Sequence, residues 1–330
     1  GSSAGLNVTT GVQNTLIGGL TGDALTTGTG NVALGYNSLS SDTTGSSTVA
    51  IGKSALAAQN LSGGANSFNT AVGHEVGQAI TTGVENTLIG ARAGDALTDS
   101  SYNVALGGYA LTSDTRGNRS VAVGHNALYS QNFTSATATY NVAVGSSAGL
   151  NVTTGVANTL IGGLSGDAIT VGGENTALGY KALSGNTTGF YNTALGSRAL
   201  ANMNVTNSSG TYNVAVGYNS GTNVTTGTNN ILVGGLTGDA ITTGANNTAL
   251  GGGALSENTT ASNNTAVGFY SLLSNTTGTE NVAVGANAGD ASTTASYNTL
   301  IGSIAGSALT TGGENVAVGR AALFAGTTGT

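Results

Sequence analysis

The feature that most constrains this chain is a short internal repeat. A five-residue motif, Asn-[Val/Thr]-[Ala/Leu]-[Val/Leu/Ile]-Gly, recurs 18 times in 330 residues, with Thr48 and Ser120 replacing two of the first asparagines and Ile231 standing at one second position. Successive motifs lie 17 residues apart, except for three intervals of 21 that begin at Thr48, Ser120 and Asn192. We call each interval a coil, number its positions from the first motif residue, and call one position in all coils a column. A repeat this short fits one turn of a β-solenoid and is too short for helix pairs or leucine-rich units.

A second, longer period lies on top of the first. Three coils of 17 residues and one of 21 make a unit of 72, and the Gly-Asp-Ala string places Asp23, Asp95, Asp167 and Asp239 that far apart. Residues 1–20 accordingly return at 145–164 with a single change. We expect residues 1–330 to form a single continuous solenoid domain of 18 coils plus partial ends, and to be a segment of a longer repeat protein.

Each coil has the composition of strands and turns. Residues 31–35 (NVALG) predict a short strand, Ser38 and Leu39 the apolar part of a second, and residues 43–45 (TTG) a strand end closed by a turn. Helix is disfavoured because Thr, Val, Asn and Gly have poor helix propensity. The predicted fold class is therefore all-β, a parallel β-solenoid of 17-residue coils with three 21-residue coils.

Three columns are nearly invariant and predict stacked rows of like residues. The fifth position is always Gly, which indicates a positive φ or close approach of the next coil. Asn at position 1 tolerates left-handed backbone and bonds local backbone groups, so stacked coils would form an amide ladder. Thr at position 13 is fixed in the 17-residue coils, whereas position 14 varies, so the fixed Thr is expected to face a packed environment. The expected rows include Asn14, Asn31, Asn69, Asn86, Gly18, Gly35, Gly52, Gly73, Thr26, Thr43 and Thr81, and the Thr column ends at Thr327.

The strand motif is apolar on both faces. Position 3 is always Ala or Leu and position 4 is always Val, Leu or Ile, and these two side chains point in opposite directions. A strand with two apolar faces is usually covered on both. One face can pack inside the coil, and the other, expected to be a long Ala/Leu stripe, predicts a parallel homo-oligomer. The alternative is a broader monomeric coil whose own loops cover the outward stripe.

Composition excludes several function classes. Charged residues make up 6% of the chain and the net charge is −7, which gives no basic surface for nucleic acid. No apolar run of 18 residues is present, so membrane insertion of this segment is not expected. His74 and His125 are three coils apart, about 14 Å at about 4.8 Å per coil, too far to share a zinc ion. We expect no catalytic residue, no metal site and no cofactor, and hence no enzyme.

The motifs NVALGYNSL, NTAVGHEVG and NVAVGSSAG resemble the head repeats of trimeric autotransporter adhesins, the YadA-like family. Similar repeats occur in phage tail fibres and in bacterial surface fibre proteins. The resemblance covers all 18 coils. It implies a left-handed β-roll, trimerised along its length, located at a cell surface or on a virion fibre and binding host or surface glycans or proteins.

The functional prediction is a non-enzymatic extracellular fibre or adhesin segment, with two alternatives. One is a purely structural self-assembling filament. The other is an ice-binding protein that uses its Thr columns, although adjacent Thr-Thr pairs place only one hydroxyl on a face. Aromatic residues before the Asn could stack on carbohydrate or simply cover the turn between coils. The long coils are the candidate contact loops because loops on a rigid scaffold carry function, and the residues singled out there are Asn60, Phe68, Asn132, Tyr140, Asn204 and Tyr212.

Overall fold

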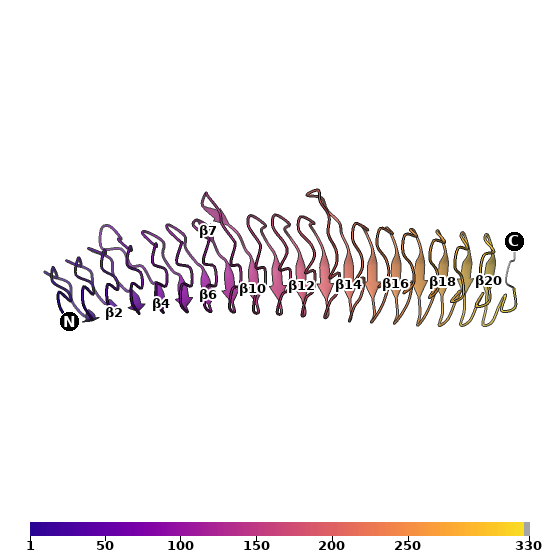
Figure 1. The fold of residues 1–330 in the computed structure, drawn as a ribbon, viewed down its shortest axis with the longest axis horizontal. Coiled ribbons are helices and arrows are strands. Elements are labelled where there is room, and N and C mark those ends of the chain that lie inside the picture. The colour runs from indigo at the N-terminus through magenta and orange to yellow at the C-terminus, as the bar shows by residue number, and fades with distance from the viewer. Residues whose placement is uncertain (327–330) are drawn as a thin grey trace. The chain divides into compact units, whose positions relative to one another are not determined.

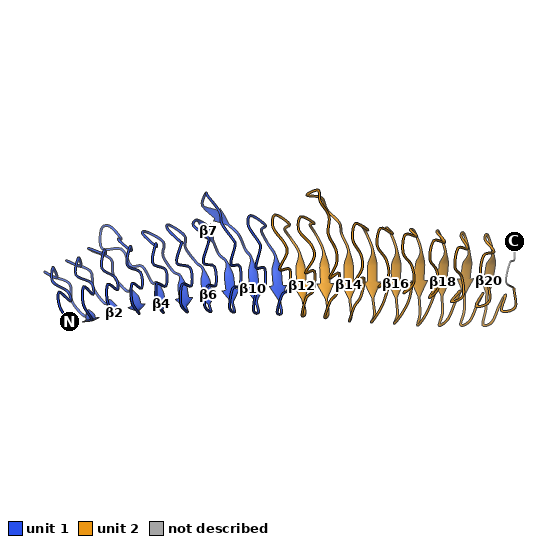
Figure 2. Cartoon of the chain, viewed as in Figure 1, with its two compact units in different colours: residues 1–164 blue, residues 165–330 orange. Residues whose placement is uncertain are grey.

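The computed structural model describes residues 1–326, and over that range it contains strands and turns but no helix. Thr327, the last expected member of the Thr column, lies outside the described residues. The chain divides into two compact units, Gly1–Leu164 and Ser165–Thr330 (Figure 2). Each unit has the architecture of a parallel β-solenoid, which confirms the predicted fold class. The interpretation of the whole chain as one continuous domain stays a prediction, as does the left-handed sense.

Unit 1 has nine three-residue strands that pair in parallel in chain order within its described coils (Figure 1). The pairing is residue for residue, so that Leu16 lies beside Ala33 and Ala33 beside Ala50. These strands are β1 (Thr15–Ile17), β2 (Val32–Leu34), β3 (Val49–Ile51), β4 (Thr70–Val72), β5 (Thr87–Ile89), β6 (Val104–Leu106), β8 (Val121–Val123), β10 (Val142–Val144) and β11 (Thr159–Ile161), and a separate two-stranded sheet joins β7 (Gly117–Asn118) to β9 (Thr137–Ala138).

Unit 2 repeats the same construction, with nine parallel strands among its described residues. The 21-residue step falls between β13 and β14, where Ala194 still pairs with Ala215. The extra residues of a long coil therefore leave the strand ladder in register. The strands are β12 (Thr176–Leu178), β13 (Thr193–Leu195), β14 (Val214–Val216), β15 (Ile231–Val233), β16 (Thr248–Leu250), β17 (Thr265–Val267), β18 (Val282–Val284), β19 (Thr299–Ile301) and β20 (Val316–Val318).

Left-handed corners keep the rest of each coil out of strand conformation. The coil that starts at Asn31 has φ of 59° at Asn37, 49° at Leu39 and 59° at Ser47, at positions 7, 9 and 17. Residues with such φ interrupt an extended run, so the expected second strand at Ser38 and Leu39 is wrong: both residues lie in a turn and are buried. Almost every residue in these three columns is unbranched at Cβ, because β-branched residues fit left-handed backbone poorly. Ile304, with φ of 55°, is the exception in the described range.

The core of each coil is a thin apolar interior built on column 3. Ala33, Ala50 and Leu88 have no exposed surface, so the middle residue of each strand points inward. Positions 9 and 12 complete the interior, and the residue type at one of them depends on the residue type at the other. Two coils with Leu at position 9 alternate with two that have Gly there. Position 12 is Asp, Gln, Asn or Met in the first kind, apart from Gly326 in the last coil, and mostly Leu, Ile or Val in the second.

The glycines of column 9 show the reason for this dependence. A Cβ on Gly77 would lie 2.9 Å from a methyl carbon of Leu88, 2.9 Å from one of Leu56 and 3.1 Å from one of Ile80. The space that a leucine would fill at position 9 is therefore occupied by side chains from position 12 and from the neighbouring coils. This keeps the interior at the close packing that protein cores require.

Candidate functional site

The Asn column forms the predicted ladder, and it also closes each coil. The Asn31 Nδ2 donates to the carbonyl of Gly45 at 2.9 Å, across the interior of its own coil. The Asn31 Oδ1 accepts the backbone N–H of Thr48 in the next coil at 3.0 Å. The same two contacts recur along both units, because the amide is the one side chain that offers a donor and an acceptor at this reach. Asn14 makes them with Gly28 and Asn31, Asn69 makes them with Gly83 and Asn86, and Asn86 makes them with Ser100 and Asn103.

The Gly column requires glycine for two independent reasons. The φ of Gly18 is 139°, a conformation that L side chains rarely adopt. A Cβ on Gly18 would also lie 2.5 Å from the carbonyl oxygen of Gly35 in the next coil, well inside contact distance. Gly35, Gly52 and Gly73 have φ between 130° and 148°, and each meets the next glycine of the column in the same way.

The two Thr columns differ in what their hydroxyls do. At position 13 the Thr26 Oγ1 donates to the carbonyl of Thr43 at 2.8 Å, and the Thr81 Oγ1 donates to the carbonyl of Thr98 at 3.3 Å. Position 14 is mostly exposed and is interrupted by Asp99 and, further along, by other residue types. The fixed hydroxyls therefore serve the contact between coils, which leaves only the interrupted outer column for ordering water.

The long coils place asparagine where the other coils have the fixed Thr. The Thr43 Oγ1 donates to the Asn60 Oδ1 at 3.0 Å, and Asn132 and Asn204 accept in the same way from Thr115 and Thr187 at 3.0 and 2.9 Å. All three asparagines are exposed. They continue the Thr column into the start of each extra loop, and so belong to the scaffold as well as to the loop surface.

A buried polar network lies beneath the first long coil, and sequence reasoning missed it. The Asp42 carboxylate accepts the backbone N–H of Gly45 at 2.9 Å and the Gln59 Nε2 at 2.9 Å. The Gln59 Nε2 also donates to Thr48, and the Gln59 Oε1 accepts from Asn69. Asp42 and Gln59 have no exposed surface, so these contacts compensate the desolvation of a charged group. The second long coil repeats the network with Asp114, Gln131, Ser120 and Asn141.

In the third long coil, three residues of this network are replaced together. Asn186, Met203 and Asn192 stand where the first has Asp42, Gln59 and Thr48. With a normal Asn in column 1 and no carboxylate that requires a hydrogen-bond donor, the amide of the glutamine is no longer needed, and Met203 fills its buried place. The two exceptions in the Asn column, Thr48 and Ser120, are thus explained by the Gln that follows eleven residues later.

The aromatic residues that directly precede a motif, at position 17 or at position 21 of a long coil, lie on the surface at left-handed corners. Phe68, Tyr140 and Tyr212 are more than half exposed, with φ between 49° and 51°. The rings of Tyr191 and Tyr212 stack at 5.0 Å, and Arg119 lies over the ring of Tyr102 at 4.8 Å. Each of these two contacts joins neighbouring coils, and Tyr102, Tyr191 and Tyr212 keep 42–54% of their surface exposed.

The outward face of the strands is partly apolar and is uncovered in the single chain: column 4 is always Val, Leu or Ile, whereas column 2 is Thr in nine of the 18 coils. Positions 2 and 4 both point away from the buried column 3. Leu178 and Leu250, both at position 4, are each 48% exposed. The stripe that the strands expose is therefore made of columns 2 and 4, whereas the Ala/Leu column lies inside. Further exposed members are Ile17, Val32, Leu34, Ile89, Ile231, Val282, Ile301, Val316 and Val318.

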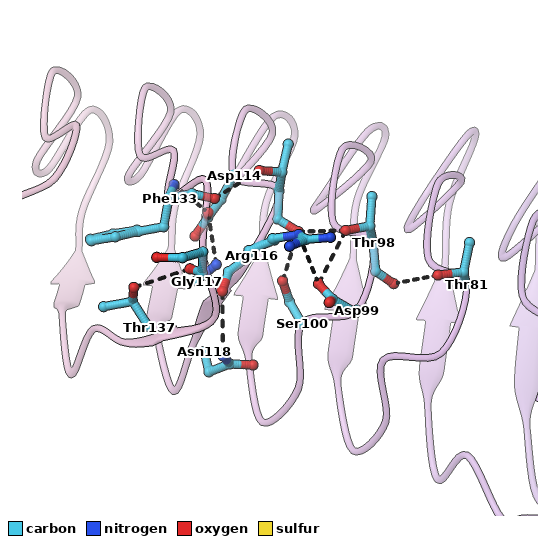
Figure 3. Close-up of polar contacts among 12 residues, drawn as sticks. Thr81, Thr98, Asp99, Ser100, Asp114, Arg116, Gly117, Asn118, Phe133 and Thr137 are labelled. Atoms are coloured by element: carbon cyan, nitrogen blue, oxygen red, sulfur yellow. Dashed lines mark hydrogen bonds and ion pairs between the residues drawn. The ribbon is translucent and has the colours of Figure 1, made fainter.

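Two pairs of opposite charges lie on the surface of unit 1. Arg92 pairs with Glu75 one coil earlier at 2.9 Å, and Arg116 lies 3.5 Å from Asp99 (Figure 3). The pKa of Arg92 is raised, chiefly by its hydrogen bond to Glu75. Burial raises the pKa of the Asp95 carboxyl, against a hydrogen bond from Thr112 that lowers it.

Burial likewise raises the pKa of Asp167, which lies in the same column as Asp95. Across residues 1–326 there is no group of three or more His, Cys, Asp or Glu side chains placed to hold a metal ion. His74 lies 3.7 Å from Glu75, whereas His125 meets the ring edge of Tyr109. In the same range, no helix is long and apolar enough to cross a membrane.

Together, the strand ladders and the invariant columns define a tandem-repeat protein of the parallel β-solenoid class. Comparisons with protein-family models, with curated proteins and with solved structures found no match for this chain. The resemblance to trimeric autotransporter head repeats therefore stays an interpretation of the motifs.

Proposed function

We propose that this chain is a non-enzymatic structural segment of an extracellular fibre or adhesin, in which parallel copies pack through the outward faces of their strands. The observation that carries the proposal is the apolar surface of columns 2 and 4. It runs along the strands of each unit, and it is supplied by every described coil.

The physics of parallel sheets favours a partner on this face. Parallel strands are generally covered on both sides, because their two faces are both apolar. Here column 3 fills the interior, and columns 2 and 4 present Val, Thr, Leu and Ile to solvent. Contiguous apolar surface of this kind on soluble proteins usually marks an interaction site. A second and a third copy, running parallel, would present the same residues in the same register.

The scaffold suits a spanning role. Each coil bonds to the next through strand pairs, the Asn column and the Thr column, and neighbouring contacts of this type make stability nearly additive along a repeat stack. The loops of the long coils, two in unit 1 and one in unit 2, project from their coils (Figure 1) and give each unit a surface to present. The resemblance of the motifs favours a trimer, and a location at a cell surface or on a virion fibre.

Sedimentation equilibrium tests the proposal. The 31.7 kDa chain is expected to sediment as a trimer. Replacing Leu178 and Leu250 by Glu places charges on the outward face and should yield a monomer with an unchanged circular dichroism spectrum. The matched control is Thr243→Glu with Thr260→Glu, two exposed positions of column 14, which accepts Asp99 and Arg116 elsewhere. A native chain that stays monomeric at high concentration would contradict the proposal.

A further inference from the structure

A polar groove in unit 2 crosses three successive coils, those that begin at Asn175, Asn192 and Asn213. It has a volume of about 370 Å³ and is formed by side chains from columns 7, 10 and 11. Two cations, Lys181 and Arg198, lie at its rim in column 7. The remaining lining residues are Ser184, Ala201, Asn202, Asn219, Thr222 and Asn223.

The two cations of the groove repel each other in the protein without a ligand. They occupy the same column in adjacent coils, which are about 4.8 Å apart, and like charges this close repel each other. In unit 1, the adjacent charges of column 7 are Glu75 and Arg92, which neutralise each other. The Asp167 carboxylate of the preceding coil interacts electrostatically with Lys181. Within the described part of the chain, however, no carboxylate lies within 4.0 Å of Lys181 or Arg198. A bound anion would supply an opposite charge in direct contact with both.

The groove is also shaped for hydroxyl groups. Lys181 is held over the ring of Tyr180 at 5.6 Å, and the backbone N–H of Arg198 donates to the Tyr180 carbonyl at 2.9 Å. The Asn202 Nδ2 donates to the Asn223 Oδ1 at 2.9 Å on the exposed surface. This bond leaves the carbonyl of one amide and the amino group of the other to face a ligand. Amide pairs and serine or threonine hydroxyls are the donors and acceptors that a polyhydroxylated molecule requires.

An apolar hollow of about 380 Å³ lies on columns 6, 7 and 10 of the next three coils of unit 2. Its walls are Phe269 and Tyr270, whose rings are 3.8 Å apart, together with Leu236 and Leu273. Its floor is glycine, and a Cβ on Gly253 could not be accommodated beside Tyr270. Binding sites commonly combine such apolar and aromatic surface with a few placed polar groups. One face of unit 2 thus presents a cationic, amide-lined groove followed by an aromatic hollow.

We propose that this face binds an acidic saccharide of the uronic-acid type, with a carboxylate between Lys181 and Arg198 and an apolar sugar face on the aromatic hollow. The inference deepens the proposed function, since it rests on the segment presenting a binding surface. A sparsely charged ligand fits better than a dense polyanion, because the chain as a whole carries a net charge of −7. The same charge disfavours nucleic acid.

Calorimetric titration of the full chain with a galactose oligosaccharide that carries a single galacturonate residue tests the proposal. Lys181→Gln and Arg198→Gln should each weaken binding about tenfold, as expected for the loss of a charge-assisted hydrogen bond. Lys181→Arg should retain it. The matched control is Lys53→Gln, which removes an exposed lysine of unit 1 and should leave binding unchanged. Phe269→Ala tests the aromatic hollow and should weaken binding without changing its salt dependence.

Several results would overturn the inference. They are failure of the oligosaccharide to bind, equal binding of a neutral galactose oligosaccharide, equally strong competition by inorganic sulfate, or preference for an oligonucleotide. Sedimentation equilibrium distinguishes failure of the saccharide site from failure of the proposed fibre. Lys181→Gln with Arg198→Gln should leave the trimer mass unchanged. If the chain is monomeric but still binds galacturonate through Lys181, the fibre assembly is contradicted and the saccharide site is supported.

Discussion

The backbone N–H of Asn247 donates to the Oδ1 of Asn230, one coil earlier, at 3.0 Å. The Nδ2 of Asn230 in turn donates to the carbonyl of Gly244 at 2.9 Å, within its own coil. One buried side chain thus closes a coil and bonds it to the next. This double duty gives a physical reason for Asn in 16 of the 18 coils.

Replacing Asn230 by Ala should destabilise the protein by about 3 kcal/mol. The substitution leaves the Asn247 N–H and the Gly244 carbonyl buried without partners, and each such group costs about 1–3 kcal/mol. Urea denaturation followed by circular dichroism measures the change. Asn223→Ala, which removes an exposed asparagine, is the control and should cost less than about 0.5 kcal/mol. Equal effects of the two variants would show that the ladder adds no stability.

Replacing Gly179 by Ala should cost at least about 3 kcal/mol. Its φ is 138°, and the new Cβ would lie 2.5 Å from the carbonyl oxygen of Gly196, which is backbone and cannot move aside. Gly30→Ala is the matched control, because Gly30 has φ of 67°, has open space around its Cβ and lies in a column that elsewhere holds Ala157. The control should cost about 1 kcal/mol or less. Similar melting temperatures for the two variants would contradict the steric argument.

The sequence predicted the parts of this fold that depend on a single column. Gly18 and Asn31 each require one residue type for a local reason, so their invariance was enough to infer a close approach and a ladder. The dependence between positions 9 and 12 could not be inferred in the same way. Whether Gly77 leaves room for Ile80 depends on Leu56 and Leu88 in the neighbouring coils, and packing between coils is not visible in one column.

Replacing Gln59 by Met should destabilise the first long coil by about 3 kcal/mol. The change removes the donor to Asp42 and the acceptor for Asn69, and a buried charge that loses its partner is costly. Adding Asp42→Asn and Thr48→Asn copies the third long coil and should recover at least half of the loss. Thermal unfolding of the single and triple variants measures both steps. A triple variant no more stable than Gln59→Met would contradict the compensation.

Replacing Asp167 by Asn should stabilise the protein near neutral pH. Burial raises the pKa of Asp167 above its ordinary value of 3.8, and its Oδ1 lies buried without a hydrogen-bond partner. The folded state therefore binds the proton more tightly than the unfolded state, so the carboxylate lowers stability above the raised pKa. This penalty fades as the pH falls through the raised pKa and is gone below 3.8. The melting-temperature gain should be present at pH 7 and absent at pH 3, and a gain that is constant with pH would contradict the burial argument.

The candidate sites, like the fold, could be predicted from the sequence only in part. The long coils were identified from their length, but the inward turn of Leu61 and Phe133 over the buried carboxylates was not, because position 14 is exposed in most other coils. The groove at Lys181 and Arg198 could not be predicted, because the two residues are 17 apart in sequence and their proximity depends on the register of the stack.

The claim on which the whole account depends is that like positions of successive coils stand directly above one another. Electron–electron distance measurements test it in unit 2, since the chain has no native cysteine to interfere with spin labelling. Labels at position 316 paired with labels at 248, 231 and 214 should give distances of about 19, 24 and 29 Å, rising by about 4.8 Å for each added coil. Distances that fail to rise in equal steps would contradict the stack, and with it the ladder, the outward face and the saccharide groove.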